Sequence, residues 1–197
     1  MPWFTAVRIR NRSTVSVALV ALAAIAATAG CSSSDGDTAK KSPSPTTASP
    51  TSTVSAAEAQ ARKDVIAAYQ GMTDEQVKAY AKSSLAGSKI TTYATGKALR
   101  DVKNSVFVNL QNGIIVKGEP KVTASEDDVT LNSTGTTQRA SLKVCFDMNT
   151  WDPVDNRTGK SVAPPNQVKR YTITAQLKKQ GSQWQVTDEK ADKEKTC

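Results

Sequence analysis

The sequence predicts an α+β domain in which helices come first and an antiparallel sheet follows. Between residues 55 and 102 apolar side chains recur three and four positions apart, and from 106 onwards they recur at every second position. Three of the later segments have one apolar and one polar face, which is typical of an antiparallel sheet covered on one side. Helices followed by strands, without alternation, favour the α+β class.

The first 30 residues have the features of a secretory leader. Arg8, Arg10 and Arg12 precede a largely apolar run at 15–27, and small residues follow it. Such a run is shorter than the roughly 20 apolar residues that a membrane-spanning helix needs. Basic residues, a short apolar core and a small-residue end are the three parts of a signal peptide. We therefore expect residues 1–30 to be removed during export.

The end of this leader predicts a lipid anchor. The run Thr-Ala-Gly-Cys at 28–31 resembles the bacterial lipobox, in which a cysteine receives a diacylglyceryl group before cleavage; Thr28 departs from the usual Leu, Val or Ile. Two acyl chains are what stable anchoring requires. A plain signal peptide cleaved near Ala29, or an uncleaved anchor, is the alternative. We expect lipidation of Cys31 and a location on the outer face of the cytoplasmic membrane.

Composition predicts a flexible linker after the anchor. Of the 22 residues at 32–53, 15 are Ser, Thr or Pro and none is large and apolar. Such a segment cannot bury enough surface to offset the entropy of ordering it. The expected organisation is therefore a signal peptide at 1–30, the lipidated cysteine with its linker at 31–53, and one folded domain at 54–197.

Two helices are predicted at the front of the domain. Ser55 and Glu58 form a capping-box pattern, and helical spacing runs from there to residue 81. Gly71 suggests a kink or break, after which Thr73 would cap a second segment. A further helix is expected at 93–102, where Ala98 and its neighbours share one side.

Six strands are predicted in the second half of the domain. Short strands at 106–110, 114–117 and 121–124 are separated by turn residues at 112–113 and 118–120. Longer strands follow at 140–146, 171–177 and 183–186. The segment 151–167, rich in Pro, Asn, Asp and Gly, is expected to be a long exposed hairpin loop.

The cysteines predict one disulfide. With Cys31 carrying lipid, Cys145 and Cys197 have one possible pairing, and thiols outside the cell are normally oxidised. Two free thiols are the alternative. A redox-active pair is normally close-spaced, as in Cys-x-x-Cys, so a structural role is expected.

Several segments together resemble a known group of proteins. They are the helix ending in Ala-Tyr, Tyr-Ala-Thr-Gly-Lys-Ala-Leu at 93–99, the Gly-x-Pro turn at 118–120, Leu-Lys-Val-Cys-Phe-Asp at 142–147, the hairpin at 181–186 and the terminal cysteine. The chain is similar here to actinobacterial lipoproteins of the nuclear transport factor 2-like, cone-shaped superfamily. The resemblance implies a curved antiparallel sheet around amino-terminal helices, often with a hydrophobic cavity, and leaves function open.

The sequence lacks most of the residues and motifs that catalysis commonly uses. It contains no histidine, no glycine-rich phosphate loop and no Gly-x-Ser-x-Gly elbow. Cone-fold isomerases resembling ketosteroid isomerase use a carboxylate with a tyrosine. Tyr69, Tyr80 and Tyr93, with Asp147, are the raw material for such a site, although helix packing explains the tyrosines better. We predict no catalytic residue and no cofactor, and keep the tyrosines as residues of a cavity or partner surface.

The 151–167 region raises two further questions. Asp147, Asp152 and Asp155 suggest calcium, but their spacing differs from an EF-hand loop and turn formation explains them equally well; no metal site is predicted. Trp151 either folds back on the sheet or is displayed to a partner, and packing is preferred.

These observations predict a non-enzymatic binding or adaptor lipoprotein at the cell envelope. Its expected partners are the membrane, through the anchor, and an envelope protein or cell-wall component. Scattered aromatic residues and export argue against nucleic acid, and the oligomeric state is left open. A carrier of a small apolar ligand, or an enzyme resembling ketosteroid isomerase, is the alternative.

Overall fold

The computed structural model describes residues 54–134 and 137–197, so the expected leader, Cys31 and linker lie outside the described residues. Three helices precede the sheets: α1 (Ala56–Tyr80), the short α2 (Ile90–Tyr93) and α3 (Gly96–Gln111). In the described part of the chain, no helix is both long enough and apolar enough to cross a membrane.

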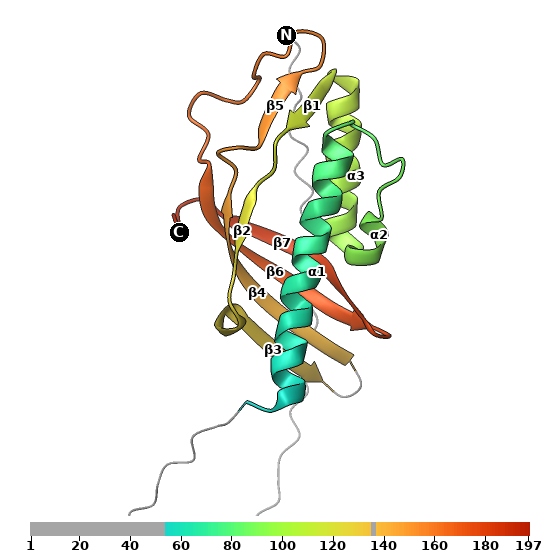
Figure 1. Cartoon of the computed structure of the whole chain (residues 1–197), viewed down its shortest axis with the longest axis vertical. Coiled ribbons are helices and arrows are strands. Elements are labelled where there is room, and N and C mark those ends of the chain that lie inside the picture. The colour runs from blue at the N-terminus through green and yellow to red at the C-terminus, as the bar shows by residue number, and fades with distance from the viewer. Residues whose placement is uncertain (1–53, 135–136) are drawn as a thin grey trace, which may run out of the picture. The chain divides into compact units, whose positions relative to one another are not determined.

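Seven strands follow the helices in two antiparallel sheets. They are β1 (Ile114–Lys117), β2 (Lys121–Thr123), β3 (Val129–Thr134), β4 (Thr137–Asp147), β5 (Asp152–Asp155), β6 (Arg170–Gln180) and β7 (Gln183–Asp192), with a 3₁₀ turn, η1 (Glu126–Asp128), before β3. The larger sheet has the order β2-β4-β6-β7, and β3 pairs with β4 beyond the end of β2. A small ribbon of β1 and β5 stands at one end of it (Figure 1).

The helices cover one face of the larger sheet, as the α+β prediction required (Figure 1). Alternate residues of the central strands are buried against the helices, whereas their neighbours lie on the outer face. From the helices, Val65, Ala68 and Met72 enter this core at helical spacing. The core fills the space between one helical layer and one sheet. The inward residues of the central strands are Ala140, Leu142, Val144, Phe146, Tyr171, Ile173, Ala175 and Leu177.

The first helix has the predicted start and no break. The Ser55 hydroxyl accepts a hydrogen bond from the Glu58 amide at 3.2 Å, but the Glu58 carboxylate pairs with Arg62 instead of closing a capping box. The break suggested at Gly71, with a second segment capped by Thr73, is wrong, because α1 runs through both residues. A Cβ atom at Gly71 would lie 2.6 Å from the Tyr93 ring, so this glycine lets α2 approach α1 closely.

The predicted strand at 106–110 is also wrong. These residues are the end of α3, and Ala98, Val102 and Val106 are its buried positions, each four residues after the last. Their β-branched and aromatic composition suggested a strand, but packing at a spacing of four decides the structure. The helix expected at 93–102 therefore begins at Gly96 and is longer.

The predicted strands at 114–117 and 121–124 and the three longer strands are present as β1, β2, β4, β6 and β7. Strands β3 and β5 were not predicted. The segment expected to be an exposed loop therefore begins with a strand, in which Val154 is buried.

Candidate functional site

The most unusual contact of the interior joins a carboxylate to a tyrosine. The Tyr69 hydroxyl, on α1, donates a 2.8 Å hydrogen bond to Oε1 of Glu189, on β7, 120 residues away in the chain. Tyr69 is only 1% exposed. A carboxylate within hydrogen-bond reach of a buried tyrosine is an arrangement that acid–base chemistry can use.

A β-bulge turns Glu189 towards the helices. On β6, Leu177 pairs with Val186 and Ala175 pairs with Glu189, so the register shifts between them. Thr187 and Asp188 together oppose Gln176, and the Thr187 hydroxyl donates to the Gln176 carbonyl at 3.0 Å. Such a bulge re-aims the side chains that follow it. Without it, the alternation that buries Val186 would bury Asp188 and leave Glu189 outside.

Burial shifts the ionisation of this pair. The pKa of Glu189 is raised above its ordinary value, chiefly because burial disfavours the charged form, and the Tyr69 hydrogen bond offsets part of the rise. The pKa of Tyr69 is raised well above its ordinary value by burial and by the charge of Glu189. Ionisation of either group is therefore costly at this position.

Two further tyrosines lie within the electrostatic range of Glu189. Burial first, and then the charge of Glu189, raise the pKa of Tyr171. The pKa of Tyr80 is raised chiefly by burial, with a smaller contribution from Glu189. The structure thus brings two of the three tyrosines singled out in the sequence, Tyr69 and Tyr80, into one neighbourhood, together with Tyr171 and Glu189, which the sequence analysis did not select.

A group of ion pairs lies at the surface next to Glu189. Lys97, in the first turn of α3, lies 2.7 Å from Asp101 and 3.2 Å from Asp188, and the side chains of all three are about half exposed. Gly96, with a φ of 58°, brings the start of α3 against the bulge, because a Cβ atom there would lie 3.2 Å from the Thr187 carbonyl oxygen. The bulge and the helix start hold each other in place.

Tyr80 and Trp151 belong to an aromatic cluster. Their rings stack with centroids 5.6 Å apart, and Phe146 packs edge-on to Trp151 at 5.9 Å. Trp151 therefore folds back on the sheet, as preferred from the sequence. Its indole nitrogen is buried and has no hydrogen-bond acceptor among the described residues. Tyr93 lies apart from this cluster, against Gly71.

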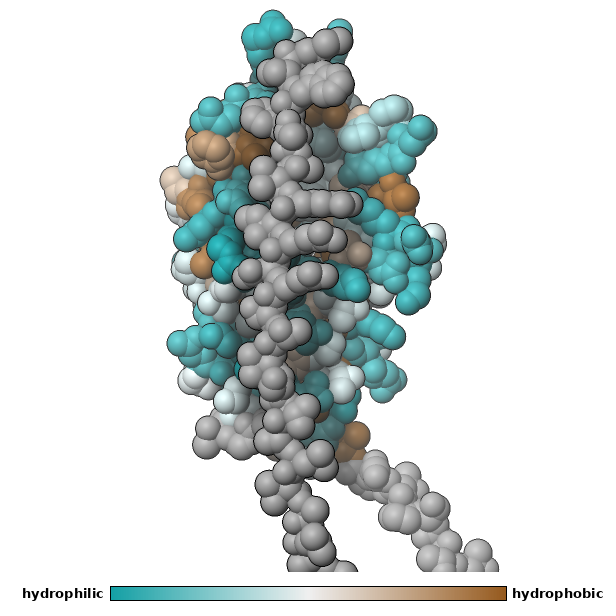
Figure 2. Space-filling view, turned by 180° about the vertical axis from the view of Figure 1, so that it is seen from behind, coloured by the Kyte–Doolittle hydropathy of each residue, from teal (hydrophilic) through white to brown (hydrophobic). Residues whose placement is uncertain are grey.

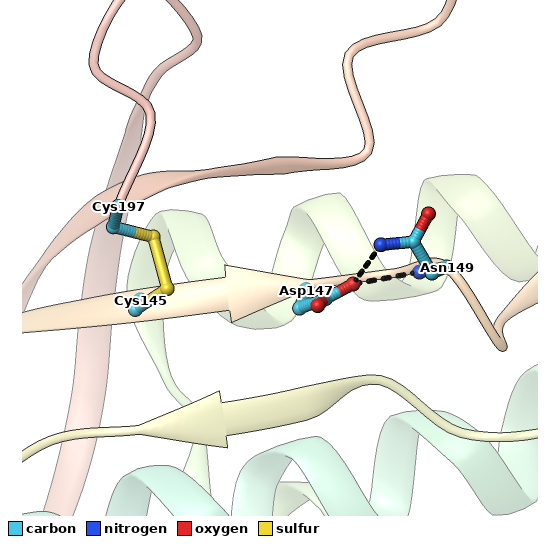
Figure 3. Close-up of a disulfide and its surroundings, with 4 residues drawn as sticks. All are labelled: Cys145, Asp147, Asn149 and Cys197. Atoms are coloured by element: carbon cyan, nitrogen blue, oxygen red, sulfur yellow. Dashed lines mark hydrogen bonds between the residues drawn. A yellow bond between two sulfur atoms is a disulfide. The ribbon is translucent and has the colours of Figure 1, made fainter.

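The acidic residues around the 151–167 segment stabilise turns. Asp147 accepts bonds from the backbone and the side chain of Asn149 at 2.9 and 2.7 Å (Figure 3). Asp155 accepts from the amides of Arg157 and Thr158. Within 54–134 and 137–197 no three His, Cys, Asp or Glu side chains gather where they would hold a metal ion. Asp147 does not converge with the tyrosines.

The disulfide expected from the sequence is present. Cys145, on β4, is bonded to Cys197, 52 residues later, with the Cα atoms 5.6 Å apart (Figure 3). It holds the end of the chain on the outer face of the sheet, where the Thr172 amide also donates to the Lys195 carbonyl at 3.0 Å. Its position, away from the helices, fits a structural role.

Four hollows of the described surface lie away from the Tyr69–Glu189 pair. One of about 490 Å³ runs between α1 and the start of β2, with Thr73, Val77, Pro120 and Val122 in its lining. Three others lie beside the disulfide, at the 164–168 segment, and between α1 and η1. Neither Tyr69 nor Glu189 lines any of these four.

Comparisons with known proteins show a distant likeness in fold. No protein-family model matches the chain, and no curated protein matches it. Among solved structures, the chain is similar to the intermembrane space region of the chloroplast protein ARC6, at 15% identity and a TM-score of 0.45. The match covers 68% of this chain and 95% of that one.

Proposed function

We propose that this protein is a lipid-anchored, extracytoplasmic adaptor that binds a partner through the surface of its domain and catalyses no reaction. The observation that carries the proposal is the filled interior. Tyr69, Met72, Leu142, Val65 and Val102 are among the largest fully buried side chains, and they occupy the space between helices and sheet. Because that space is occupied, a partner would be bound by the outer surface of the domain.

The Tyr69–Glu189 pair supports the same conclusion. The Tyr69 hydroxyl already donates its proton to Glu189, so these two groups bond each other and need no ligand between them. Tyr69 and Glu189 thus satisfy each other within the protein.

We further propose that the α+β arrangement is the cone implied by the sequence resemblance. Helices on one face of an antiparallel sheet, together with a bulge that increases local bending in β7, are consistent with a curved sheet. An experimental structure with a flat sheet would remove this assignment and leave the coarser α+β class.

The lipid anchor is proposed from the leader and Cys31. The expected result is that Cys31→Ser either blocks maturation or moves the protein from the membrane fraction to the medium or periplasmic fraction. Mass spectrometry of the amino-terminal peptide should find an acylated Cys31 in the native protein. Unchanged membrane partition in Cys31→Ser would refute the anchor.

The adaptor role is tested by photo-crosslinking in intact cells, with reactive residues placed at exposed positions around the domain. A defined envelope protein or wall component, captured from one face and not from the opposite one, is the expected result. Co-purification of a small apolar molecule, with no captured macromolecule, would replace the adaptor by a carrier.

An enzyme resembling ketosteroid isomerase remains the second candidate, because Tyr69 and Glu189 supply the residue pair that such chemistry uses. It predicts proton exchange next to the carbonyl of a ketosteroid probe, abolished by Glu189→Gln. No exchange above the uncatalysed rate in the native protein would eliminate this candidate.

A further inference from the structure

One end of the domain combines exposed apolar and basic side chains. At this end, called the tip, α1 and α3 finish and the β1–β5 ribbon stands (Figure 1). The Ser83 hydroxyl donates to the Ile114 carbonyl, and the Asn156 amide donates to the Gly113 carbonyl at 2.8 Å. These bonds make the tip one connected surface. It comprises residues 81–84, 103–117 and 152–160.

Three large apolar side chains of α3 are exposed at the tip. Phe107, Val108 and Leu110 are 61%, 53% and 59% exposed, whereas their neighbour Val106 is buried. Viewed from behind, apolar side chains reach the surface at the level of the tip (Figure 2). Elsewhere along α3 the outward residues are polar or charged, so the apolar surface is confined to the last turns.

Exposed cations share the tip with this apolar surface. The tip carries five exposed cations, and none of them forms a salt bridge within the described residues: Lys82, Lys103, Lys117, Arg157 and Lys160. Its two carboxylates, Asp152 and Asp155, are half-buried and accept hydrogen bonds within their own ribbon. The tip is therefore net positive.

The opposite end of the domain has mixed charge. Here α1 begins, and the turn η1 contributes three successive carboxylates at 126–128 (Figure 1). Glu58 and Glu126 are paired with Arg62 and Lys63 at this end. An anionic surface would therefore attract the tip more than the base.

We propose that the tip docks on the anionic lipid surface of the membrane that carries the anchor. Exposed apolar side chains at the end of a helix, together with Lys and Arg at the same end, are the chemistry that binds a headgroup layer and enters its acyl boundary. The proposal depends on the proposed lipid anchor in one respect only, which is that the anchor would hold the protein at this membrane.

The tether permits this orientation. The linker at 32–53 meets the domain at the base, and α1, with 25 residues, is about 37 Å long. The 22 linker residues extend at most about 75 Å. The chain can therefore leave the membrane at Cys31, reach the base of the domain, and still let the tip touch the bilayer.

Vesicle binding by the processed chain tests the proposal. The protein is residues 31–197 with Cys31→Ser, which lacks the acyl chains and retains every residue that the structure describes. It should sediment with vesicles of equal parts phosphatidylglycerol and phosphatidylcholine, and much less with phosphatidylcholine alone. Raising the salt concentration should weaken the binding, because exposed charges are screened.

Variants of the exposed residues separate the tip from the rest of the surface. Phe107→Ser with Leu110→Ser should weaken binding by roughly tenfold or more, because two apolar side chains no longer leave water. Lys103→Gln should weaken it by about fivefold. The matched controls, Val168→Ser and Lys143→Gln, alter exposed residues away from the tip and should leave binding unchanged.

Three results would overturn the proposal: equal binding to both vesicle types, no effect of the Phe107 and Leu110 changes in a folded variant, or equal losses in the controls. A protein captured through position 107, without vesicle binding, would also overturn it and make the tip a protein-docking surface. Because the assay uses no acyl group, an unlipidated Cys31 in cells would refute the anchor and leave the vesicle result standing.

Discussion

At the residue scale, the position of Glu189 shows how one extra residue redirects a side chain. Strand β7 alternates normally through Trp184 and Val186. The bulge then turns Glu189 towards the helices, although an uninterrupted alternation would leave it facing solvent. The result is a carboxylate held against Tyr69, with a pKa raised chiefly by burial. The ionisation of Glu189 is thereby linked to folding.

This linkage predicts a pH dependence that Glu189→Gln removes. Because the folded-state pKa of Glu189 lies above its ordinary value of 4.5, its contribution to stability is complete below that value and is lost as pH rises through the folded pKa. Glutamine retains an acceptor for Tyr69 and does not ionise. The unfolding free energy of the native protein, minus that of the variant, should therefore fall as pH rises from about 4.5 through the folded pKa. Denaturant unfolding of both proteins across this range measures it.

The Tyr69→Phe variant gives a second test of the link between Glu189 ionisation and folding. The tyrosine hydrogen bond stabilises the ionised carboxylate and lowers the pKa of Glu189, so its loss should move the pH-dependent window to higher pH. A difference between native and Glu189→Gln proteins that is flat with pH, or that rises, would contradict the buried, linked carboxylate.

Residues differ in how far their roles were predictable. Tyr69 was selected because helical spacing placed it on the buried side of α1, and the disulfide followed from having two cysteines left to pair. Glu189 could not be found in this way, because a carboxylate in a Lys- and Asp-rich strand end is expected to face solvent. Only the long-range register of β6 and β7 reveals the bulge.

At the element scale, the errors arise where local composition and long-range packing disagree. Val106, Phe107 and Val108 are typical of a strand, yet they continue α3 because Val102 and Val106 both pack on the core. β3 was missed because Val129–Thr134 is mostly polar, and its pairing with β4 decides its structure. The sequence of this segment alone does not indicate that pairing.

The contact between α1 and α2 gives a prediction at this scale. Gly71→Ala favours the helix by about 0.5–1 kcal/mol, but the new Cβ would lie 2.6 Å from the ring of Tyr93. Overpacking of this kind costs about 1–3 kcal/mol, so the variant should be less stable than the native protein. Thermal or denaturant unfolding measures the change.

Removing the opposing ring should reverse the sign. In a Tyr93→Ala background the same Gly71→Ala change should stabilise the protein, since only the helix preference remains. A destabilising effect of equal size in both backgrounds would show that the glycine serves something other than the close approach of Tyr93.

At the scale of the whole molecule, the sequence predicted the packing of helices on a sheet better than it predicted which exposed residues lie together. Alternation in β4, β6 and β7 correctly indicated a sheet covered on one side, because burial imposes period two on every strand. It did not predict that exposed apolar residues of α3 and basic residues of the β1–β5 ribbon gather at one end, because those residues come from segments far apart in the chain.

Docking through the tip makes a prediction about linker length. If the tip touches the bilayer, the base of the domain stands about 37 Å away, the length of α1, and the linker must span that gap. Deleting residues 36–47 leaves ten linker residues, which reach at most about 35 Å. In the lipidated protein on phosphatidylglycerol vesicles, hydrogen exchange at residues 107–111 should be slowed in the native chain and not in the deletion variant. Replacing 36–47 by an equal length of Gly-Ser sequence should restore the protection, because only reach matters. Protection that persists in the deletion variant would mean that α1 lies flat on the membrane.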